Sequence, residues 1–580
     1  MKKILVFLKD YKKESVIAPL FKMLEAIFEL IVPLVVAQMI DIGISNRDTS
    51  YIFSRCGILI LLAVIGLVCA VCAQYFAARA AVGFAAKLRS ALFSHIQKLS
   101  YADVDEIGTS TLITRMTSDV NQLQSGVNMV LRLFMRSPFV VFGAMIMAFT
   151  VDVKAALVFV VAIPLLSIVV FGVMLITMPM YKRVQAALDK VLGKTRENLT
   201  GARVIRAFNK EEKEIEEFHE SNEVLTNMQL LVGRISALMN PVTLIIVNAA
   251  TLVILWIGAG QVDTGNLTQG EVVALVNYMS QILVELVKLA NLIILITKAV
   301  ACGNRVANVL GKEPAIQERV QAPVEAKADA PMVVFQEAAM HYGKSNEEAL
   351  SGISFEAYKG ETIGVIGSTG SGKSTLVNLI PRFYDVSKGA VLIEGTDVRD
   401  YPLEQLRKKV GVVPQKAVLF HGTIAENLRW GNADATDEAI WKAMELAQAT
   451  DVINGKEDGL HHMIEQDGRN LSGGQKQRLT IARALVKQPD ILILDDSASA
   501  LDFVTDARLR SALQGITEER TIFIVSQRTS SIQHADRIIV LEDGEAVGIG
   551  THKELLETCV VYKEIHDSQF QKEKGGSVHE

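Results

Sequence analysis

Residues 367–374 carry a glycine-rich pattern that follows directly on a strand-like run. The run Thr362–Ile366 leads into GSTGSGKS, which has the spacing G-x-x-x-x-G-K-[ST]. Glycines in such a loop let backbone N–H groups curl around phosphate oxygens, and a helix beginning near Thr375 would add the partial positive charge of its N-terminus. We expect Lys373 to neutralise the β- and γ-phosphates and Ser374 to ligate Mg²⁺. The pattern therefore predicts a site for ATP with Mg²⁺.

The predicted phosphate-binding residues are consecutive in the chain: Gly367, Ser368, Thr369, Gly370, Ser371, Gly372, Lys373, Ser374 and Thr375. A second predicted strand, Ile491–Leu494, is wholly apolar and ends in Asp495. An aspartate at this place can hold the magnesium shell of a P-loop fold. A turn aspartate with no ligand is the alternative, and the P-loop upstream favours the metal role.

A second glycine pair lies between these two motifs. The sequence LSGGQ consists of Leu471, Ser472, Gly473, Gly474 and Gln475, and the helical stretch 476–486 follows it. Adjacent glycines before a helix make another anion cradle. Two cradles in one domain cannot both grip the same γ-phosphate from one side, so we expect the second to serve a nucleotide bound by another chain.

The first half of the chain has the composition of a membrane domain. Of the 580 residues 50% are hydrophobic and 21% charged, and apolar runs of 20 or more recur before residue 302. Six segments are long enough to span a bilayer: 16–44, 52–82, 128–150, 154–179, 235–262 and 271–301. We expect a transmembrane domain over 1–311, a linker with three prolines over 312–332, and a soluble α/β domain over 333–580.

Basic residues predict the orientation of these spans. The joins after the second and fourth spans are long and basic, and the N-terminal tail adds five lysines. By the positive-inside rule, both termini and both long joins are cytoplasmic in a multi-pass protein. These joins keep helical spacing, so we expect the helices to continue into the cytoplasm and to turn near Thr109–Ser118 and Ala202–Glu212. The first segment is too long for a signal peptide and carries Glu25 and Glu29.

Charge and cysteine content exclude some classes of protein. With 59 Lys and Arg against 64 Asp and Glu, the net charge is −5, so nucleic acid is not an expected partner. Five cysteines, an odd number in a long chain, argue against a disulfide framework and fit a protein facing a reducing cytosol.

Several polar residues nevertheless occur inside the predicted spans. In the sixth span they share one helical face: Asn277, Gln281, Glu285, Lys288 and Asn291. Two further pairs lie one turn apart, Glu25 with Glu29 and Arg132 with Arg136. Intramembrane polar groups usually face the bundle interior or a water-filled cavity. They form either a cavity wall suited to cationic amphiphiles or internal salt bridges, and the sequence leaves both interpretations open.

Taken together, these motifs carry a family resemblance. LSGGQ between the two phosphate motifs resembles the signature of the ATP-binding cassette (ABC) superfamily, and six preceding spans in one chain resemble an exporter half-transporter. The resemblance implies a six-helix α transmembrane domain with long cytoplasmic helical extensions, followed by an α/β P-loop nucleotide-binding domain. It also implies an ATPase coupled to the export of amphipathic drugs, lipids or peptides, with ATP and Mg²⁺ as cofactors.

The resemblance assigns roles to single residues. Tyr342 matches the aromatic residue that stacks on adenine, and Gln415 matches the glutamine that touches Mg²⁺ or the attacking water. Asp502, in the sequence SALD, matches a loop that lies across the dimer interface. The metal-binding residues implied are thus Ser374, Gln415 and Asp495.

Two positions depart from the family pattern. Asp496 stands where the family has a glutamate that acts as general base, and its carboxylate is retracted by about 1.5 Å, roughly one C–C bond. Gln527 stands where the family has a histidine, and glutamine can donate one hydrogen bond but cannot carry a proton. Together with Gln415, these are the catalytic positions, and the two changes predict a site that binds ATP and hydrolyses it slowly.

An intact LSGGQ beside a weakened catalytic site favours a heterodimer. A partner half-transporter would supply a glutamate and a histidine, and this chain's signature would complete the partner's competent site. The chain therefore resembles the degenerate-site subunit of a bacterial heterodimeric multidrug exporter. A homodimer with a slow aspartate base and a regulatory or channel-like subunit are the alternatives.

Overall fold

The computed structural model describes residues 2–319, 322–325, 327, 329–343, 347–454, 456, 458–517 and 520–574. It divides into two compact units: Met1–Gln97 with Ser110–Lys312, and Lys98–Thr109 with Glu313–Glu580. The short segment Lys98–Thr109 thus packs with the second unit although both of its ends continue into the first. Four residues of the expected linker, Val320, Gln321, Ala326 and Ala328, lie outside the described residues.

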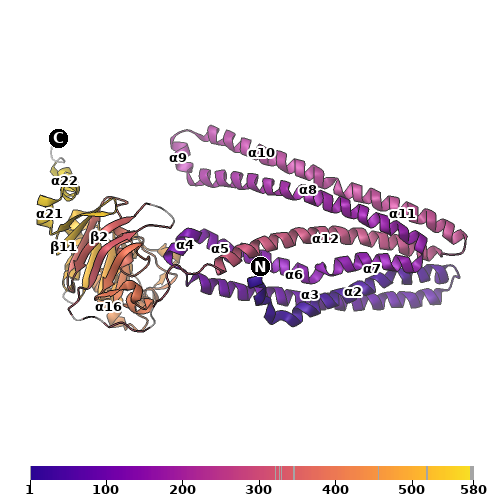
Figure 1. Ribbon diagram of the computed structural model, residues 1–580, viewed down its shortest axis with the longest axis horizontal. Coiled ribbons are helices and arrows are strands. Elements are labelled where there is room, and N and C mark those ends of the chain that lie inside the picture. The colour runs from indigo at the N-terminus through magenta and orange to yellow at the C-terminus, as the bar shows by residue number, and fades with distance from the viewer. Residues whose placement is uncertain are drawn as a thin grey trace. The chain divides into compact units, whose positions relative to one another are not determined.

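Long helices make up the first unit (Figure 1). In chain order the elements are α1 (Lys2–Leu5), η1 (Val6–Tyr11), α2 (Lys12–Gln38), η2 (Met39–Ile44), α3 (Thr49–Ile96), α5 (Thr109–Thr114), η3 (Arg115–Asp119), α6 (Val120–Met129), η4 (Val130–Phe134), α7 (Arg136–Val151), α8 (Val153–Thr200), α9 (Ala202–Ala207), α10 (Glu211–Ala237), α11 (Met239–Asp263) and α12 (Gln269–Leu310). Within the described residues they form six helical runs long and apolar enough to cross a membrane. This confirms the predicted six-helix membrane domain.

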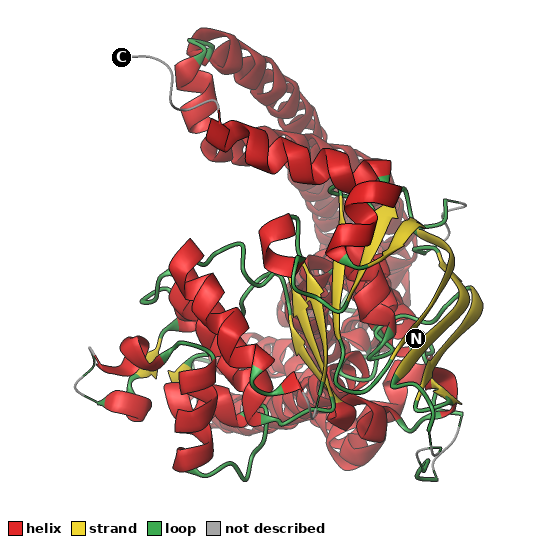
Figure 2. Ribbon diagram, turned by 90° about the vertical axis from the view of Figure 1, so that its left-hand side faces the viewer, coloured by secondary structure: helices red, strands yellow, loops and turns green. Residues whose placement is uncertain are grey.

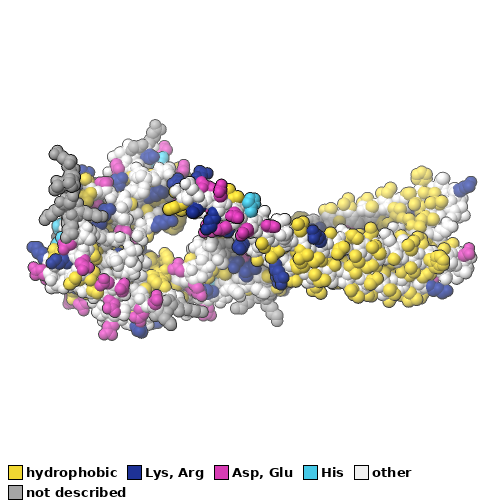
Figure 3. All heavy atoms as spheres, turned by 90° about the horizontal axis from the view of Figure 1, so that it is seen from above, with side chains coloured by type: hydrophobic (Ala, Val, Ile, Leu, Met, Phe, Trp, Pro, Cys, Tyr) yellow, Lys and Arg dark blue, Asp and Glu magenta, His cyan; other side chains and the backbone are white. Residues whose placement is uncertain are grey.

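The outer surface of these helices is apolar. Trp256 is 83% exposed, Phe53 77% and Ile168 70%, which would be unfavourable in water but is expected against lipid tails. Figure 3 shows hydrophobic side chains (yellow) covering the long helices, with charged side chains gathered beyond that band. The first unit therefore has a surface suited to a bilayer.

One of the two predicted cytoplasmic turns is misplaced. The chain turns at Ser100–Gly108 rather than near Thr109–Ser118, because a separate helix, α4 (Tyr101–Ile107), forms there. Ser100 and Asp103 make a reciprocal capping box at its start, and Gly108 ends it with a φ of 82° that favours glycine. The second turn, at α9 (Ala202–Ala207), lies within the predicted range.

Buried ion pairs connect three helices of the membrane unit. Arg136 of α7 donates to Glu285 of α12 at 2.6 Å and to Glu29 of α2 at 2.5 Å. Glu285 also accepts from Ser137 at 2.8 Å and from Lys288 at 2.8 Å. Arg136 and Glu285 are both buried, so each charge is stabilised mainly by the other. The internal salt bridge proposed from the sequence exists for these residues.

Among the described residues of the second unit, the strands form three sheets (Figure 2). The strands are β1 (Val333–Met340), β2 (Leu350–Ala357), β3 (Thr362–Gly367), β4 (Lys388–Ile393), β5 (Thr396–Asp397), β6 (Val410–Val413), β7 (Gly422–Thr423), β8 (Met463–Ile464), β9 (Ile491–Asp495), β10 (Thr521–Val525), β11 (Arg537–Glu542) and β12 (Glu545–Gly550). The main sheet has the order β12-β11-β3-β10-β9-β6, in which β11, β3, β10, β9 and β6 are parallel. A four-stranded antiparallel sheet has the order β2-β1-β4-β5.

Helices cover this sheet and form a second subdomain beside it (Figure 2). They are α13 (Lys373–Leu379), η5 (Val398–Asp400), α14 (Leu403–Lys409), α15 (Ile424–Arg429), α16 (Asp437–Leu446), α17 (Thr450–Asn454), η6 (Gly459–His461), η7 (Gln466–Gly468), α18 (Gly473–Val486), α19 (Phe503–Gln514), α20 (Thr529–Ile532), α21 (His552–Thr558) and α22 (Val560–Lys574). One core joins β1, β3 and β9 through residues such as Phe335, Val365 and Ile493, and another joins α15, α16 and α18. The predicted α/β architecture is confirmed.

Removing the central cation of the membrane cluster should destabilise the first unit. In Arg136→Met, Glu29 loses its partner, and Glu285 keeps only Lys288 and Ser137 while it remains buried. Breaking a buried pair on one side typically costs about 3 kcal/mol or more, so heat denaturation in detergent should occur at least about 5 °C lower. Lys213→Met is the matched control, because Lys213 faces Glu217 in an exposed pair at 3.9 Å. Equal midpoints for the two variants would contradict a stabilising role for Arg136.

Candidate nucleotide-binding site

Four chemically important segments meet at one edge of the main sheet. Because the carboxyl ends of parallel strands lie at the same edge, the residues that follow β3, β9, β10 and β6 come close together. These are the P-loop after β3, Asp495 and Asp496 at the end of β9, Gln527 after β10, and Gln415 after β6. Strand order therefore assembles residues that are up to 160 positions apart.

The P-loop is closed around its own lysine. Lys373 Nζ donates to the carbonyl oxygen of Gly367 at 3.0 Å and to that of Ser368 at 2.5 Å. Gly370 and Gly372 have φ values of 89° and 94°, and a Cβ on Gly372 would lie 2.7 Å from the carbonyl oxygen of Ala349. Burial lowers the pKa of Lys373, although the neighbouring carboxylates oppose that effect. The ammonium group is thus desolvated and held where a phosphate would compensate its charge.

The two strongest magnesium candidates touch each other. Ser374 Oγ donates to Asp495 Oδ1 at 3.0 Å, and Asp495 is buried at the end of β9. Burial raises the pKa of Asp495, and the hydrogen bond from Ser374 only partly offsets this. A buried carboxylate beside a hydroxyl offers the hard oxygen donors that Mg²⁺ prefers. These two residues fit a magnesium ion.

Asp496 and Gln415 form a second contact next to this pair. Gln415 Nε2 donates to Asp496 Oδ2 at 3.3 Å. The backbone of Asp496 has a φ of 46°, in the left-handed region that aspartate tolerates better than most residues, and its N–H donates to the carbonyl oxygen of Val525. The carboxylate therefore points from the end of β9 toward the neighbouring strand β6, which Gln415 follows.

Gln527 is held by a residue that the sequence did not indicate. Gln569 of α22 donates from Nε2 to the carbonyl oxygen of Gln527 at 2.7 Å, and its Oε1 accepts from the N–H and hydroxyl of Thr529, each at 2.9 Å. The side chain of Gln527 itself is exposed. A single glutamine in a polar C-terminal helix gives no sequence signal, because its partners lie about 40 residues away.

The signature residues lie at the start of α18, and Leu471 among them belongs to the helical core rather than to the P-loop core. Ser472 and Gln475 form a capping box, with Ser472 N–H donating to Gln475 Oε1 at 3.0 Å. A Cβ on Gly473 would meet nothing within 4 Å, whereas one on Gly474 would lie 3.1 Å from the carbonyl oxygen of Ala500. Leu471 is buried. Gly473 thus leaves an open approach to the N-terminus of a 14-residue helix.

Tyr342 and Asp502 complete the set of predicted residues. Tyr342 follows β1, is 42% exposed, and shares a hydrogen bond of 2.9 Å with the hydroxyl of Thr375. Its ring is therefore close to the P-loop helix α13. Asp502 caps α19 by accepting from the N–H of Thr505 at 2.9 Å, a structural role alongside the interface role expected from the sequence.

The residues present fit a nucleoside triphosphate with Mg²⁺. Backbone N–H groups at a helix start, a desolvated lysine and a serine–aspartate pair lie at the ends of β3 and β9, and the accessible ring of Tyr342 is bonded to the same helix through Thr375. Such a set can hold phosphates, a hard cation and a planar base.

Family comparisons agree with this geometry. Residues 15–286 match the family described as the ABC transporter transmembrane region, and residues 350–499 match the family described as ABC transporter. The two matches together cover more than half of the chain.

Relatives align along almost the whole length. YfiB of Bacillus subtilis, an uncharacterized ABC transporter ATP-binding protein, is 37% identical over 573 residues and covers 99% of both chains. YgaD of the same species is 34% identical over 578 residues, covering 98% of this chain and 99% of its own, and its name refers to multidrug export. An ATP-dependent lipid A-core flippase of Hahella chejuensis is 32% identical over 507 residues, covering 86% and 85%.

A solved structure shares the fold. A bacterial Atm1-family ABC exporter with ATP bound superposes with a TM-score of 0.79 at 22% sequence identity, covering 98% of this chain and 99% of that one. ABC exporters of this kind work as dimers in the membrane, and their cassettes bind ATP. The chain belongs to the ABC exporter family, as a multi-pass half-transporter of bacterial type with membrane domain and transport-coupled ATPase in one polypeptide.

Proposed function

We propose that this chain is the slow-hydrolysing subunit of a heterodimeric exporter. The observation that carries the proposal is the pairing of two substitutions, Asp496 and Gln527, at a sheet edge where the other expected ATP-binding groups are present. The chain binds ATP with Mg²⁺ through Lys373, Ser374, Gln415 and Asp495, and Tyr342 stacks on the adenine. A magnesium ion held by these residues would neutralise part of the charge of the triphosphate.

Asp496 limits hydrolysis through reach and orientation. A general base must lie within roughly 2.6–3.2 Å of the water that it deprotonates. The aspartate carboxylate is retracted by about one C–C bond relative to glutamate, and one of its oxygens already accepts from Gln415 at 3.3 Å. Asp496 therefore holds water less well than glutamate would, while Lys373 and Asp495 retain their binding roles.

Gln527 removes a second contribution to the rate. An imidazole can carry a proton and a positive charge toward a phosphate, whereas a carboxamide can only donate a hydrogen bond. Gln569 holds the backbone of Gln527 at 2.7 Å, so the side chain starts from a fixed point. Gln527 in place of histidine thus leaves an uncharged hydrogen-bond donor at this position. Such a donor supports the binding of ATP more than its hydrolysis.

The open approach to the signature supports a partner with a competent site. Gly473 has no atom within 4 Å of a Cβ position, and α18 presents its N-terminal N–H groups there. This chain's Ser472, Gly473 and Gly474 would complete the partner's ATP site, with Asp502 in the interface. In a homodimer, both intact signatures would serve sites that carry Asp496 and Gln527. We therefore favour a different partner chain, which has glutamate and histidine at the two corresponding positions.

The cargo is amphipathic and enters the membrane unit. A cavity of about 410 Å³ lies among α2, α7 and α12, with apolar walls that include Val36, Val140 and Val284 and polar groups that include Glu29 and Gln281. Names of relatives refer to multidrug export and to flipping of lipid A-core. We therefore propose export of drugs, lipids or peptides across a bacterial cytoplasmic membrane, with both termini, α4 and α9 in the cytoplasm and domains over 1–311 and 333–580.

Loss of the P-loop ammonium should weaken ATP binding at this chain's own site. Removing a charge-assisted hydrogen-bond donor typically costs about 1.5–3 kcal/mol, so Lys373→Ala should raise the Kd for a fluorescent ATP analogue by about 10- to 100-fold. Lys359→Ala, at an exposed turn between β2 and β3, serves as the control. Some hydrolysis should persist in the complex with the partner. An unchanged Kd in Lys373→Ala would refute the assignment of the phosphate site.

Substitution of the signature should damage turnover more than substitution of Asp496. In the complex with the partner, Gly473→Asp places a carboxylate where the partner's γ-phosphate would lie, and the ATPase rate should fall by about 10²–10³. Asp496→Asn should reduce the same rate by less than about fivefold, because the slow site contributes little of it. The opposite order of damage would show that the sites are assigned to the wrong chains.

Restoring both missing groups should raise the rate of the chain purified alone. Asp496→Glu extends the carboxylate toward the attacking water, and Gln527→His adds a side chain that can carry a proton. Each change is worth up to about 10²–10⁴ in rate, while the other ATP-binding residues stay in place. Steady-state phosphate release, with the oligomeric state measured in the same sample, gives the comparison. If the wild-type chain alone hydrolysed ATP as fast as the complete heterodimer, the slow-site proposal would fail.

A further inference from the structure

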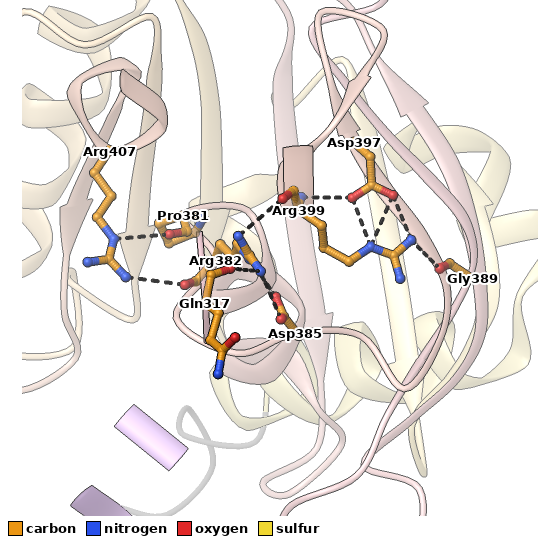
Figure 4. A network of polar contacts seen from close by, with 8 residues as sticks. All are labelled: Gln317, Pro381, Arg382, Asp385, Gly389, Asp397, Arg399 and Arg407. Atoms are coloured by element: carbon orange, nitrogen blue, oxygen red, sulfur yellow. Dashed lines mark hydrogen bonds and ion pairs between the residues drawn. The ribbon is translucent and has the colours of Figure 1, made fainter. Parts of the chain in front are cut away.

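The loop that follows the P-loop helix is held unusually firmly. Arg382 is 1% exposed and donates to Asp385 at 2.7 and 3.0 Å, to the carbonyl oxygen of Arg399 at 3.3 Å, and to that of Gln317 at 3.3 Å. Arg407 donates to the carbonyl oxygens of Pro381 and Arg382, at 3.4 and 3.3 Å. Figure 4 shows the Arg407 guanidinium at Pro381 and Arg382, and the Arg382 guanidinium at Asp385, within the loop 381–385. Residues 381–385 therefore have a fixed backbone.

This fixed loop presents two aromatic side chains to α4. Phe383 packs on Tyr101 with ring centroids 4.6 Å apart, and the guanidinium of Arg407 lies 5.6 Å from the Phe383 ring. Tyr384 donates its hydroxyl to Asp105 Oδ2 at 2.7 Å and lies 6.4 Å from the ring of Tyr101. Helix α4, which lies between α3 and α5 in the chain, thus contacts the loop 381–385 that follows the P-loop helix α13.

Tyr384 also contacts the predicted adenine site. Its ring meets Tyr342 edge-to-face, with centroids 5.2 Å apart and an interplanar angle of 83°. Tyr342 in turn shares a 2.9 Å hydrogen bond with Thr375 of α13. One unbroken series of contacts therefore runs from Thr375 through Tyr342 and Tyr384 to Asp105 of α4.

We propose that Tyr384 is a positioning residue that transmits adenine occupancy at Tyr342 to α4. The inference rests on the proposed role of Tyr342 in stacking on adenine. Stacking fixes the Tyr342 ring, the edge-to-face contact then restricts Tyr384, and the restricted hydroxyl holds Asp105. Because α4 continues covalently into α3 and α5, nucleotide binding acts on the membrane helices without hydrolysis. A slow site is useful under this arrangement, since bound ATP maintains the contact.

The hydrogen bond between Tyr384 and Asp105 has a donor that stays protonated and a charged acceptor. Burial and the Asp105 carboxylate raise the pKa of Tyr384, so the phenol stays protonated and remains a donor. The carboxylate acceptor makes the bond charge-assisted, which is stronger than a neutral one. Asp103, two residues away, is buried and accepts from the N–H of Ala315 at 2.9 Å, so α4 keeps a second attachment when Tyr384 changes.

Hydrogen exchange of the full-length chain tests the proposal. Exchange of peptides covering 98–109 is measured with and without Mg²⁺ and a non-hydrolysable ATP analogue, and the Kd of the analogue is measured in parallel. In the wild type the analogue should slow exchange about threefold, the range of one net hydrogen bond. In Tyr384→Phe this slowing should fall to about 1.5-fold or less while the Kd stays within about twofold, since the ring that supports Tyr342 is kept.

Four further variants sharpen the result. Tyr358→Phe is the matched control, because Tyr358 donates to Glu356 Oε2 at 2.8 Å in the same unit, outside the Tyr342–Tyr384–Asp105 series. Asp105→Ala should reduce the slowing of exchange as much as Tyr384→Phe does. Asp105→Asn should keep most of the slowing, because its carbonyl oxygen still accepts. Asp105→Ala combined with Tyr384→Phe should lose no more of the slowing than either single variant.

The outcomes separate this inference from the proposed function. A full α4 response in Tyr384→Phe, at unchanged affinity, would overturn the role of Tyr384 and leave the slow-site proposal standing. An equal loss in Tyr358→Phe would also overturn it. A Kd unaffected by Tyr342→Ala would instead remove the adenine assignment on which the inference rests.

Discussion

Replacing the hydration of a triphosphate is the constraint on which the second unit depends. Water solvates several adjacent negative charges well, so a protein must offer fixed N–H groups, a cation and a metal site at one point. The parallel order β3-β10-β9-β6 provides that point, because each of these four strands is followed there by a functional segment. Lys373 already bonds two backbone carbonyl oxygens of its loop, and Ser374 already touches Asp495. The site is therefore preorganised, and small side-chain changes decide its rate.

A different cost governs the membrane unit. Charges within a bilayer require partners, and Arg136, Glu285, Glu29 and Lys288 satisfy one another across three helices. Similar hydrogen bonds hold α12 elsewhere: Tyr278 donates to the carbonyl oxygen of Leu30 in α2, and Gly270 N–H donates to Asp41 in η2, both at 2.7 Å. These bonds hold helices together where apolar side chains have no advantage over lipid. An ATP-driven rearrangement must therefore either break these bonds or move the bonded helices together as a rigid body.

Local sequence patterns predicted the parts of the fold that local physics determines. The strands β3 and β9 and the P-loop followed from apolar runs and glycine spacing, and six spans followed from length and hydropathy. The turn at α4 was misplaced because Ser100, Asp103 and Gly108 lie in a stretch that otherwise keeps helical spacing. Contacts between distant residues were beyond this reasoning, as with Gln569 on Gln527, Tyr384 on Asp105, and the choice of Glu285 as partner of Arg136. Such pairings depend on tertiary packing, which single residues do not encode.

Under the proposed function, this chain's site holds ATP while the partner's site hydrolyses it. The most direct measurement uses the purified heterodimer, turning over azido-ATP radiolabelled at either the α- or the γ-phosphate, followed by photocrosslinking and separation of the two chains. This chain should retain both labels equally through many turnovers, whereas the partner should retain chiefly the α-label. Loss of the γ-label from this chain as fast as from its partner would contradict the proposed division of roles.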